Sequence, residues 1–305
     1  MKIAVIGAGA MGTLFGGRLA QAGNDVTMVD VNPSVIDAIS SRGIILEDEE
    51  GEHHIPAASC RGEELNEPQD LAILFTKTMY SRSALKSAKG FIGSSTTVLT
   101  LQNGLGNIEL VEEFVEPSQI LAGVTNYASD VTGPGAIRTQ GAGFVRLYSA
   151  DGTMRPSVTA VHQALKDAGF AAEIYPDVLV AIWEKAAFNA AINSTCALAH
   201  VPCGGIGKVA EGRELAFQIA RETAAVAQAS GVDASAERVI ESLKFSFVHH
   251  KDHYPSMAQD VMKKRRTEID SINGEIVRRG EAKGISVPYT KAVYALMKVV
   301  EASFA

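Results

Sequence analysis

The sequence predicts an α/β fold: a doubly wound sheet with an antiparallel extension, followed by an all-α C-terminal domain. Three observations support this prediction. The first half of the chain alternates short apolar runs with amphipathic stretches, a glycine-rich turn follows the first apolar run, and the pattern is helical for most of the chain after residue 177. Alternating strands and helices favour parallel strands joined by right-handed crossovers.

The elements of the first half follow from local signals. The expected strands lie at residues 2–6, 26–29, 71–75 and 97–101, with a hairpin over residues 44–56. The first helix follows the glycine-rich turn and ends near Gly23. Pro33 begins the second helix, because proline suits the first helical turn, and Gly43 ends it. Glycines and a proline divide residues 124–147 into short β-type runs, which predict the antiparallel extension.

The second half is expected to be helical. The expected helices cover residues 178–199, 211–230, 236–247, 256–283 and 288–305. Proline and glycine predict a break at residues 201–207, between the first two helices. At roughly 150 residues per domain, the 305-residue chain is expected to form two domains. We place them at residues 1–174 and 175–305.

Composition excludes several classes of protein. The chain has 28 Lys and Arg against 35 Asp and Glu, a net charge of −7, so we expect no nucleic-acid partner. No apolar run approaches the roughly 20 residues of a membrane span, and the N-terminus has no signal-peptide layout. Three cysteines favour a reducing, cytoplasmic setting without disulfides. Apolar faces in the helical half are compatible with a homodimer.

The glycine-rich turn predicts a Rossmann-like dinucleotide site. It reads Gly7-Ala8-Gly9-Ala10-Met11-Gly12, between a strand and a helix. This spacing permits a tight turn and lets a pyrophosphate approach the helix N-terminus. Asp30, at the end of the next strand, is placed to accept hydrogen bonds from a ribose and to repel a 2′-phosphate, which favours NAD(H) over NADP(H). In the alternative, Asp30 points away and Asn32 or Ser34 accepts a phosphate.

Polar residues follow one face of the helix expected at residues 178–199. Lys185, Asn189 and Asn193 are spaced by four residues, so they share a face over about 12 Å. Because the surrounding residues are apolar, the lysine and amides need partners. Either a substrate carbonyl and its hydroxyl product supply them, with the lysine as a general acid, or they form a satisfied polar seam in a helical core.

Two further clusters have simpler interpretations. His249, His250 and His253 have no carboxylate between them in a zincin-like pattern, so we expect no metal. The basic run at residues 263–266 is expected to be a solvated face. Glu268 follows this run, and the residues alone favour a simple ion pair with it.

Several short motifs occur in an order that resembles a known family. They are the glycine-rich turn, Gln102-Asn103-Gly104-Leu105-Gly106, Trp183-Glu184-Lys185 with Asn189 and Asn193, Ser256-Met257-Ala258-Gln259-Asp260, and Thr267-Glu268-Ile269-Asp270-Ser271-Ile272-Asn273-Gly274. Together they resemble the ketopantoate reductase (2-dehydropantoate 2-reductase) family over essentially the whole chain. The resemblance implies a dinucleotide-binding Rossmann domain at residues 1–174 and a helical substrate and catalytic domain at residues 175–305.

The resemblance also implies roles for individual residues. Lys185 would donate a proton, and Glu268 would be the active-site glutamate. The implied substrate-binding residues are Asn103, Asn189, Asn193 and Ser256. The predicted cofactor-binding residues are Gly7, Ala8, Gly9, Ala10, Met11, Gly12 and Asp30, to which the resemblance adds Lys77 and Asn103.

The implied activity is reduction of ketopantoate to pantoate by hydride from a nicotinamide cofactor, in pantothenate and coenzyme A biosynthesis. Two alternatives are a reductase of another branched 2-oxo acid and a non-catalytic NAD(P)-sensing protein. Members of the family that prefer NADPH tend to carry an arginine near the end of the second strand, where this chain has Asp30. We therefore expect NAD(H), with NADP(H) as the alternative typical of the family.

Overall fold

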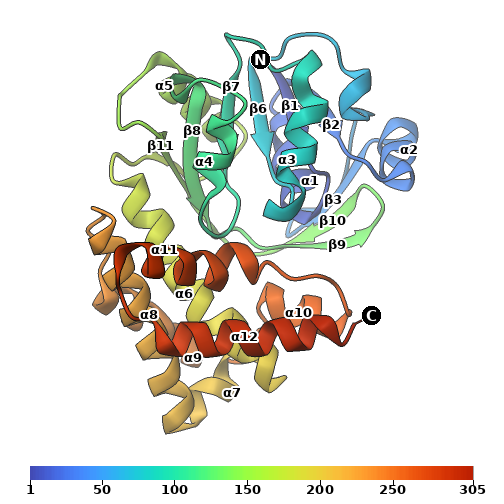
Figure 1. The fold of residues 1–305 in the computed structure, drawn as a ribbon. Coiled ribbons are helices and arrows are strands. Elements are labelled where there is room, and N and C mark those ends of the chain that lie inside the picture. Colours follow the sequence, from blue (N-terminus) through green and yellow to red (C-terminus); the bar gives the residue numbers. More distant parts are fainter. Residues whose placement is uncertain (305) are drawn as a thin grey trace. The chain divides into compact units, whose positions relative to one another are not determined.

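The computed structural model describes residues 1–304, which divide into two compact units (Figure 1). Unit 1 comprises Met1–Gln102 and Asn107–Val178, and unit 2 comprises Asn103–Gly106 and Leu179–Ala305. The loop Asn103–Gly106 therefore groups with the helical unit, although it is far from it in sequence. The physical reason is that Leu105 is buried in the helical core and its N–H donates to the Ser271 carbonyl at 2.9 Å.

Unit 1 contains an eight-stranded sheet in the order β12-β11-β8-β7-β6-β1-β2-β5. Its strands are β1 Lys2–Ile6, β2 Asp25–Val29, β5 Ala58–Cys60, β6 Leu71–Leu74, β7 Thr97–Thr100, β8 Ile120–Thr125, β11 Val145–Ser149 and β12 Ala172–Ile174. Neighbouring strands from β5 to β8 are parallel, and β11 pairs antiparallel with β8. The doubly wound sheet and its antiparallel extension are thus confirmed. The strand order reverses direction between β1 and β6, the place where such sheets bind ligands beyond the carboxyl ends of their strands.

A second, four-stranded sheet belongs to the same unit, in the order β4-β3-β10-β9. Its strands are β3 Ile44–Asp48, β4 Gly51–Ile55, β9 Ser129–Gly133 and β10 Ala136–Thr139. The expected hairpin at residues 44–56 is the antiparallel pair β3–β4. Helix α1, Ala10–Gln21, packs on both sheets, because Gly16 abuts Val5 and Met28 while Gly17 abuts Ile44.

The remaining helices of unit 1 complete the crossovers. They are α2 Pro33–Arg42, α3 Thr78–Ser87, α4 Asn107–Glu112 and α5 Pro156–Asp167, with the 3₁₀ turns Gly62–Glu64, Ala88–Gly90 and Pro117–Gln119. Pro33 and Gly43 bound α2 as expected, and the Asn32 side chain caps it by accepting from the Ser34 N–H at 3.1 Å.

Unit 2 is helical and is built around a long apolar helix. Its helices are α6 Val178–Ala199, α7 Cys203–Lys208, α8 Ala210–Ala229, α9 Ala236–His249, α10 Ser256–Met262, α11 Glu275–Lys283 and α12 Pro288–Ala302, with the π-helical turn η4 Asp270–Gly274. Buried side chains of α6 form one continuous core with those of the other helices and with Leu105. The all-α second half is confirmed.

Two local expectations were wrong. The Pro/Gly segment at residues 201–207 contains the short helix α7. The helix expected over residues 256–283 is interrupted after α10, where Lys264 has a left-handed backbone (φ +50°) and the chain leaves the helical path until η4. The side chain and N–H of Thr267 bond to Glu301 of α12, so a tertiary contact replaces the continuous helix.

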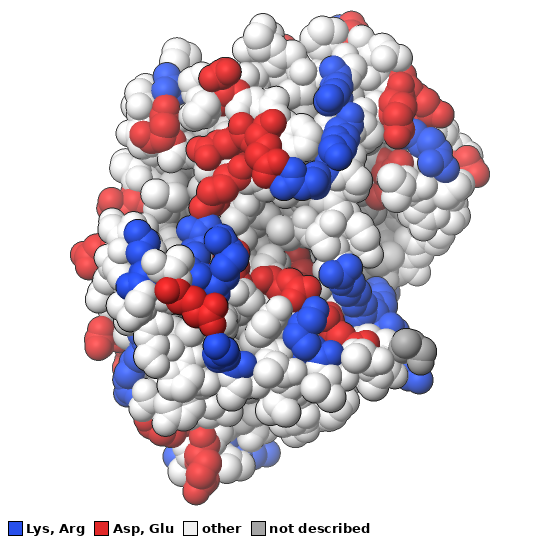
Figure 2. Space-filling view, in the orientation of Figure 1, with Lys and Arg blue, Asp and Glu red and all other residues white. Residues whose placement is uncertain are grey.

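Charges of both signs are interspersed over the face seen in Figure 2. This mixed pattern accompanies a net charge of −7 and shows no extended basic area on that face. Within residues 1–304, no helix has the length and apolarity needed to cross a membrane.

Candidate functional site

The glycine-rich turn of unit 1 has the backbone that a dinucleotide site requires. Gly7 has a φ of +100°, and a Cβ there would lie 2.9 Å from the Thr76 nitrogen. A Cβ on Gly12 would lie 1.8 Å from the Gly7 carbonyl oxygen, so the turn and α1 can meet only without side chains. A Cβ on Gly9, in contrast, would meet no described atom within 4 Å. Gly9 therefore leaves open space beside the N-terminus of α1, where backbone N–H groups favour a phosphate.

Asp30 is held against this turn. Its Oδ2 accepts from the Ala8 N–H at 2.7 Å, and its Oδ1 accepts from the N–H groups of Val31 and Asn32 at 2.8 and 2.9 Å. The carboxylate therefore does not point away. Asn32 is engaged in capping α2, where its Oδ1 also accepts from the Ser34 hydroxyl at 2.7 Å. An anionic group fixed beside the turn suits ribose hydroxyls and opposes a phosphate.

The end of β6 meets the same turn. Thr76 abuts Gly7, and Lys77 follows it as the half-buried N-cap of α3. The Gln102 amide donates to the Thr76 carbonyl and to the Ser81 hydroxyl, so it ties the end of β7 to the end of β6. The sequence alone predicts no role for Gln102, because its partners come within reach only through the parallel pairing of β6 with β7. The open space at Gly9, the helix N-terminus and Asp30 together fit a dinucleotide.

In unit 2, the predicted polar face lies on α6. Asn189 and Asn193 are buried, with 8% and 5% exposure, and Lys185 is half-buried one turn before Asn189. Neither asparagine side chain has a hydrogen-bond partner within residues 1–304. A satisfied polar seam would have paired these amides. Neither amide is among the fully buried polar atoms without a partner, so both keep some contact with solvent and can bind water or a ligand.

Lys185 and Glu268 interact electrostatically, although 83 residues separate them in sequence. Burial disfavours the charged ammonium and lowers the pKa of Lys185 to about 8, while the negative charge of Glu268 opposes part of this shift. A lysine with this pKa donates a proton readily near neutral pH, because its acidity is close to that of the solution. An ion pair between Glu268 and the basic run at residues 263–266 would not account for this interaction with Lys185.

The other expected substrate residues also belong to unit 2. Asn103 is half-buried in the loop Asn103–Gly106, where a Cβ on Gly104 would lie 2.5 Å from the Ser271 carbonyl oxygen. Ser256 is exposed at the first position of α10. Lys185 and Glu268 are joined by an electrostatic interaction, and Asn189 and Asn193 share the α6 face with Lys185.

Asn273 has a structural role that the sequence alone does not predict. It is completely buried in η4, and its Nδ2 donates to the Ala190 carbonyl at 3.1 Å and to the Ser194 hydroxyl at 3.4 Å. These bonds fasten η4 to α6, the helix of Lys185. A π-helical turn is uncommon and is often found at functional sites. The motif at residues 267–274 therefore also fastens η4 to α6, in addition to carrying Glu268.

Comparisons with known proteins agree with this arrangement. Residues 3–152 match the family described as Ketopantoate reductase PanE/ApbA, and residues 177–301 match Ketopantoate reductase PanE/ApbA C terminal. A 2-dehydropantoate 2-reductase of Streptococcus pyogenes serotype M3 is 34% identical over 99% of this chain and 98% of its own.

Two solved structures illustrate the similarity of this chain to known proteins in both fold and sequence. D-mandelate dehydrogenase, in a ternary structure with NADH and anilino(oxo)acetate, has a TM-score of 0.94 and 32% identity, covering 100% of this chain and 99% of that one. A PanE/ApbA family ketopantoate reductase from Ralstonia eutropha JMP134 has a TM-score of 0.92 and 29% identity, with the same coverage of both chains.

A sheet of this topology, with an acidic side chain held on its glycine-rich turn, places the chain among the dinucleotide-binding oxidoreductases. Within that class, it belongs to the ketopantoate reductase family, since family matches and full-length relatives span both compact units.

Proposed function

We propose that the protein reduces ketopantoate to pantoate, with a nicotinamide cofactor as hydride donor, in pantothenate and coenzyme A biosynthesis. The observation that carries this proposal is the α6 face. Lys185, with its lowered pKa, shares that face with the buried amides of Asn189 and Asn193, which have no partner within residues 1–304. A small molecule with a carbonyl and further polar groups would supply the missing hydrogen bonds. The family and its full-length relatives support ketopantoate as that molecule.

Each predicted domain supplies one half of the reaction in this proposal. Residues 1–174 would bind the cofactor, and residues 175–305 would bind the substrate and donate the proton. The cofactor-binding residues would be Gly7, Ala8, Gly9, Ala10, Met11, Gly12, Asp30, Lys77 and Asn103. When bound, the nicotinamide supplies the hydride, and the chain positions and polarises the substrate.

The side chains of unit 2 have distinct proposed roles. Lys185, as an ammonium, stabilises the negative charge that develops on the carbonyl oxygen and delivers a proton to it. Glu268 keeps Lys185 charged and oriented, or accepts from the substrate hydroxyl. Neutral hydrogen bonds to the substrate would come from Asn103, Asn189, Asn193 and Ser256. Neutral groups suit a small carboxylate that must also be released.

The proposal is tested by following the absorbance of NADH and NADPH with ketopantoate and a panel of other 2-oxo acids. Ketopantoate should be the preferred substrate, and pantoate the identified product. A second candidate, reduction of an aryl 2-oxo acid, is favoured by the similarity to D-mandelate dehydrogenase. Phenylglyoxylate therefore belongs in the panel. A higher kcat/KM for phenylglyoxylate would select the second candidate, and no turnover of any 2-oxo acid would contradict both.

Asp30 predicts a preference for NADH. The carboxylate, held by Ala8, Val31 and Asn32, should accept hydrogen bonds from ribose hydroxyls and repel a 2′-phosphate. We expect kcat/KM to be at least about tenfold higher with NADH than with NADPH, which corresponds to ~1.4 kcal/mol. Asp30→Asn should reduce this ratio, because it removes the repelling charge while keeping an acceptor. A wild-type protein that prefers NADPH would contradict the prediction.

The pKa of Lys185 predicts a pH dependence with opposite signs in the two reaction directions. Reduction needs the ammonium, so kcat/KM for reduction should be high below pH 8 and fall as pH rises through about 8. Oxidation of pantoate needs the neutral amine, so its kcat/KM should rise over the same range. Rates measured from pH 6 to 10 at saturating cofactor check both limbs. A reduction rate that stays constant to pH 10 would remove Lys185 as the proton donor.

The proposal includes a cytoplasmic compartment and a homodimer. Cys60, Cys196 and Cys203 are all free thiols, which fits a reducing, cytoplasmic compartment. Unit 2 also exposes Phe245 and Val248 on α9, with 54% and 65% exposure, and such apolar residues would suit a homodimer. Light scattering during gel filtration measures the mass in solution and tests the dimer.

A further inference from the structure

The last helix holds the segment that carries Glu268. Thr267 is completely buried, and both its N–H and its hydroxyl donate to Glu301 Oε1 of α12 at 2.7 Å. The Thr267 hydroxyl also accepts from the Ile269 N–H at 3.2 Å. The residues on either side of Glu268 are therefore fixed, although this segment lies outside any regular helix.

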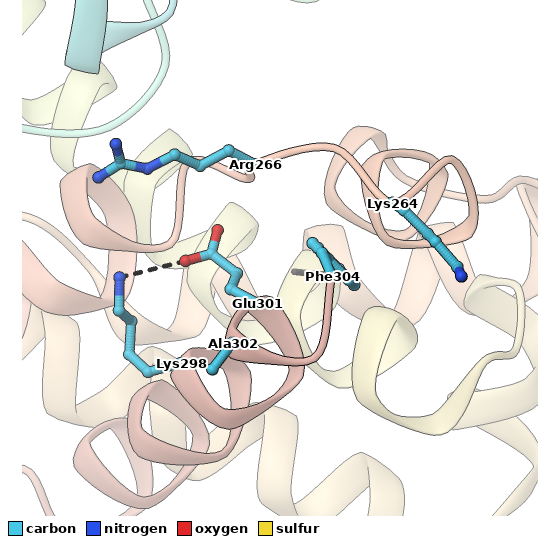
Figure 3. A pocket seen from close by; sticks show the side chains of 6 residues that line it. All are labelled: Lys264, Arg266, Lys298, Glu301, Ala302 and Phe304. Carbon is cyan, nitrogen blue, oxygen red and sulfur yellow. Dashed lines mark hydrogen bonds and ion pairs between the residues drawn. The ribbon is translucent and has the colours of Figure 1, made fainter.

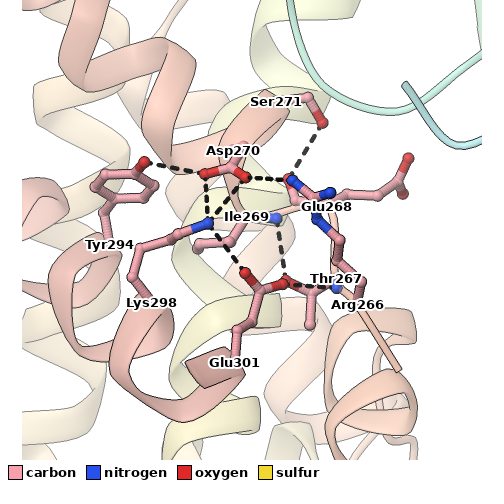
Figure 4. A network of polar contacts seen from close by, with 9 residues as sticks. All are labelled: Arg266, Thr267, Glu268, Ile269, Asp270, Ser271, Tyr294, Lys298 and Glu301. Carbon is pink, nitrogen blue, oxygen red and sulfur yellow. Dashed lines mark hydrogen bonds and ion pairs between the residues drawn. The ribbon is translucent and has the colours of Figure 1, made fainter. Parts of the chain in front are cut away.

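A second set of bonds joins α12 to the start of η4. Lys298 Nζ donates to both oxygens of Asp270, at 3.0 and 2.9 Å, and to Glu301 Oε2 at 3.1 Å. The Tyr294 hydroxyl donates to Asp270 Oδ1 at 3.0 Å. We call these five residues the anchor network: Thr267, Asp270, Tyr294, Lys298 and Glu301. In Figure 4, the Glu268 side chain points away from Asp270 and Lys298, so the network holds the backbone of Glu268 and leaves its carboxylate directed elsewhere.

The same segment is fastened to the helix of Lys185. The Glu268 carbonyl accepts from the N–H groups of Ser271 and Ile272 at 3.2 and 3.1 Å, which ties it to η4. Asn273, at the other end of η4, bonds to α6 through Ala190 and Ser194. Hydrogen bonds and the short stretches of backbone between them therefore connect α12, through Glu268, to α6.

A pocket of about 480 Å³ borders the anchor network and has an alternative interpretation as an anion site, because Lys264, Arg266 and Lys298 line it (Figure 3). Glu301 lines the same pocket, and the Lys298 ammonium already binds Glu301 and Asp270. These carboxylates would repel an added anion. The cation of Lys298 is therefore better explained as part of the anchor.

We propose that Glu301 and Thr267 are positioning residues, which hold the backbone of Glu268 so that its carboxylate remains within electrostatic reach of Lys185. This inference rests on the proposed function, in which Lys185 donates the proton. Neither residue needs to touch substrate or cofactor for this role.

Four variants separate positioning from simple stability. Thr267→Val removes the hydroxyl without changing charge, and Thr267→Ser keeps the hydroxyl. Glu301→Gln removes the carboxylate, and also makes the net charge of its cluster with Arg266, Asp270 and Lys298 one unit more positive. Glu222→Gln is the matched control, because Glu222 is a buried carboxylate that accepts the same two kinds of hydrogen bond at the other end of α12. The N–H and the hydroxyl of Thr290 donate to Glu222 at 2.8 and 2.7 Å.

The main measurement is the pKa of Lys185, read by NMR after reductive ¹³C-methylation of the lysines, with Lys185→Ala to assign the signal. Because the charge of Glu268 raises this pKa, Thr267→Val and Glu301→Gln should move the titration to a pH lower by about 0.5–1. The high-pH limb of kcat/KM should move with it, so kcat/KM for reduction above pH 8 should fall by about 3–10-fold. Thr267→Ser should titrate like the wild type. Glu222→Gln should lower Tm and leave the titration unchanged.

The outcomes distinguish this inference from the proposed function. If Thr267→Val and Glu301→Gln lower Tm but titrate like the wild type, the network is only structural and the inference is overturned. An equal shift in Glu222→Gln would overturn it as well, because general loosening would then be the cause. If the expected shifts occur but the wild type reduces no 2-oxo acid, the proposed function fails while the positioning of Glu268 is supported.

Discussion

Lys185→Ala is expected to lower kcat for reduction by about 10²–10⁴-fold, the usual range for a positioned general acid. The methyl group of alanine can neither stabilise the developing oxyanion nor supply the proton. Affinity for the cofactor should remain nearly unchanged, because the glycine-rich turn and Asp30 belong to the other compact unit. Steady-state kinetics with NADH and titration of NADH fluorescence measure the two quantities separately.

Lys208→Ala is the matched control for this variant, since Lys208 is an exposed lysine of the same unit. It should behave like the wild type in both measurements. A Lys185→Ala protein with near wild-type turnover would remove Lys185 from the mechanism. A large loss of NADH affinity would instead show that Lys185 contributes mainly to binding.

Gly9→Ala is expected to weaken NADH binding by about 10–100-fold, or ~1.4–2.7 kcal/mol, without loss of stability. Gly9 has φ −74° and ψ −169°, an extended conformation that alanine adopts without strain. The added methyl would meet no described atom within 4 Å, so the fold should accept it. It would, however, occupy the space through which a pyrophosphate approaches the backbone. Calorimetric titration with NADH and thermal unfolding check the two parts of the prediction.

Gly12→Ala provides the contrast. Its methyl would lie 1.8 Å from the Gly7 carbonyl oxygen, so this variant should lower Tm as well as NADH affinity. If Gly9→Ala bound NADH as tightly as the wild type, the open space beside Gly9 would not be the pyrophosphate site.

Local sequence signals were sufficient for most elements of the fold. These signals specify the backbone conformation of residues close to them in the chain. Examples are the apolar run at residues 2–6, the glycine-rich turn after it and the boundaries of α2 at Pro33 and Gly43. The helix at residues 178–199 was predicted with its observed bounds because its apolar composition and spacing are unbroken. The same spacing placed Lys185, Asn189 and Asn193 on one face.

Long-range contacts determined what the local signals missed. Residues 256–283 have a helical pattern, yet the bonds from Thr267 to Glu301 interrupt the helix. The loop Asn103–Gly106 groups with the helical unit because Leu105 is buried there. No spacing rule connects residues so far apart in sequence, and their contacts form only when the chain has folded.

The sequence by itself therefore determined the fold class, the dinucleotide turn with its acidic partner, and the polar face of α6, since each depends on residues close together in the chain. Only the tertiary structure decided that Asp30 bonds to Ala8, that Asn189 and Asn193 lack partners within residues 1–304, and that burial lowers the pKa of Lys185 while Glu268 opposes part of this shift. The physical reason is that burial and the electrostatic field at a side chain depend on every element packed around it, whereas backbone conformation is largely specified by its immediate neighbours.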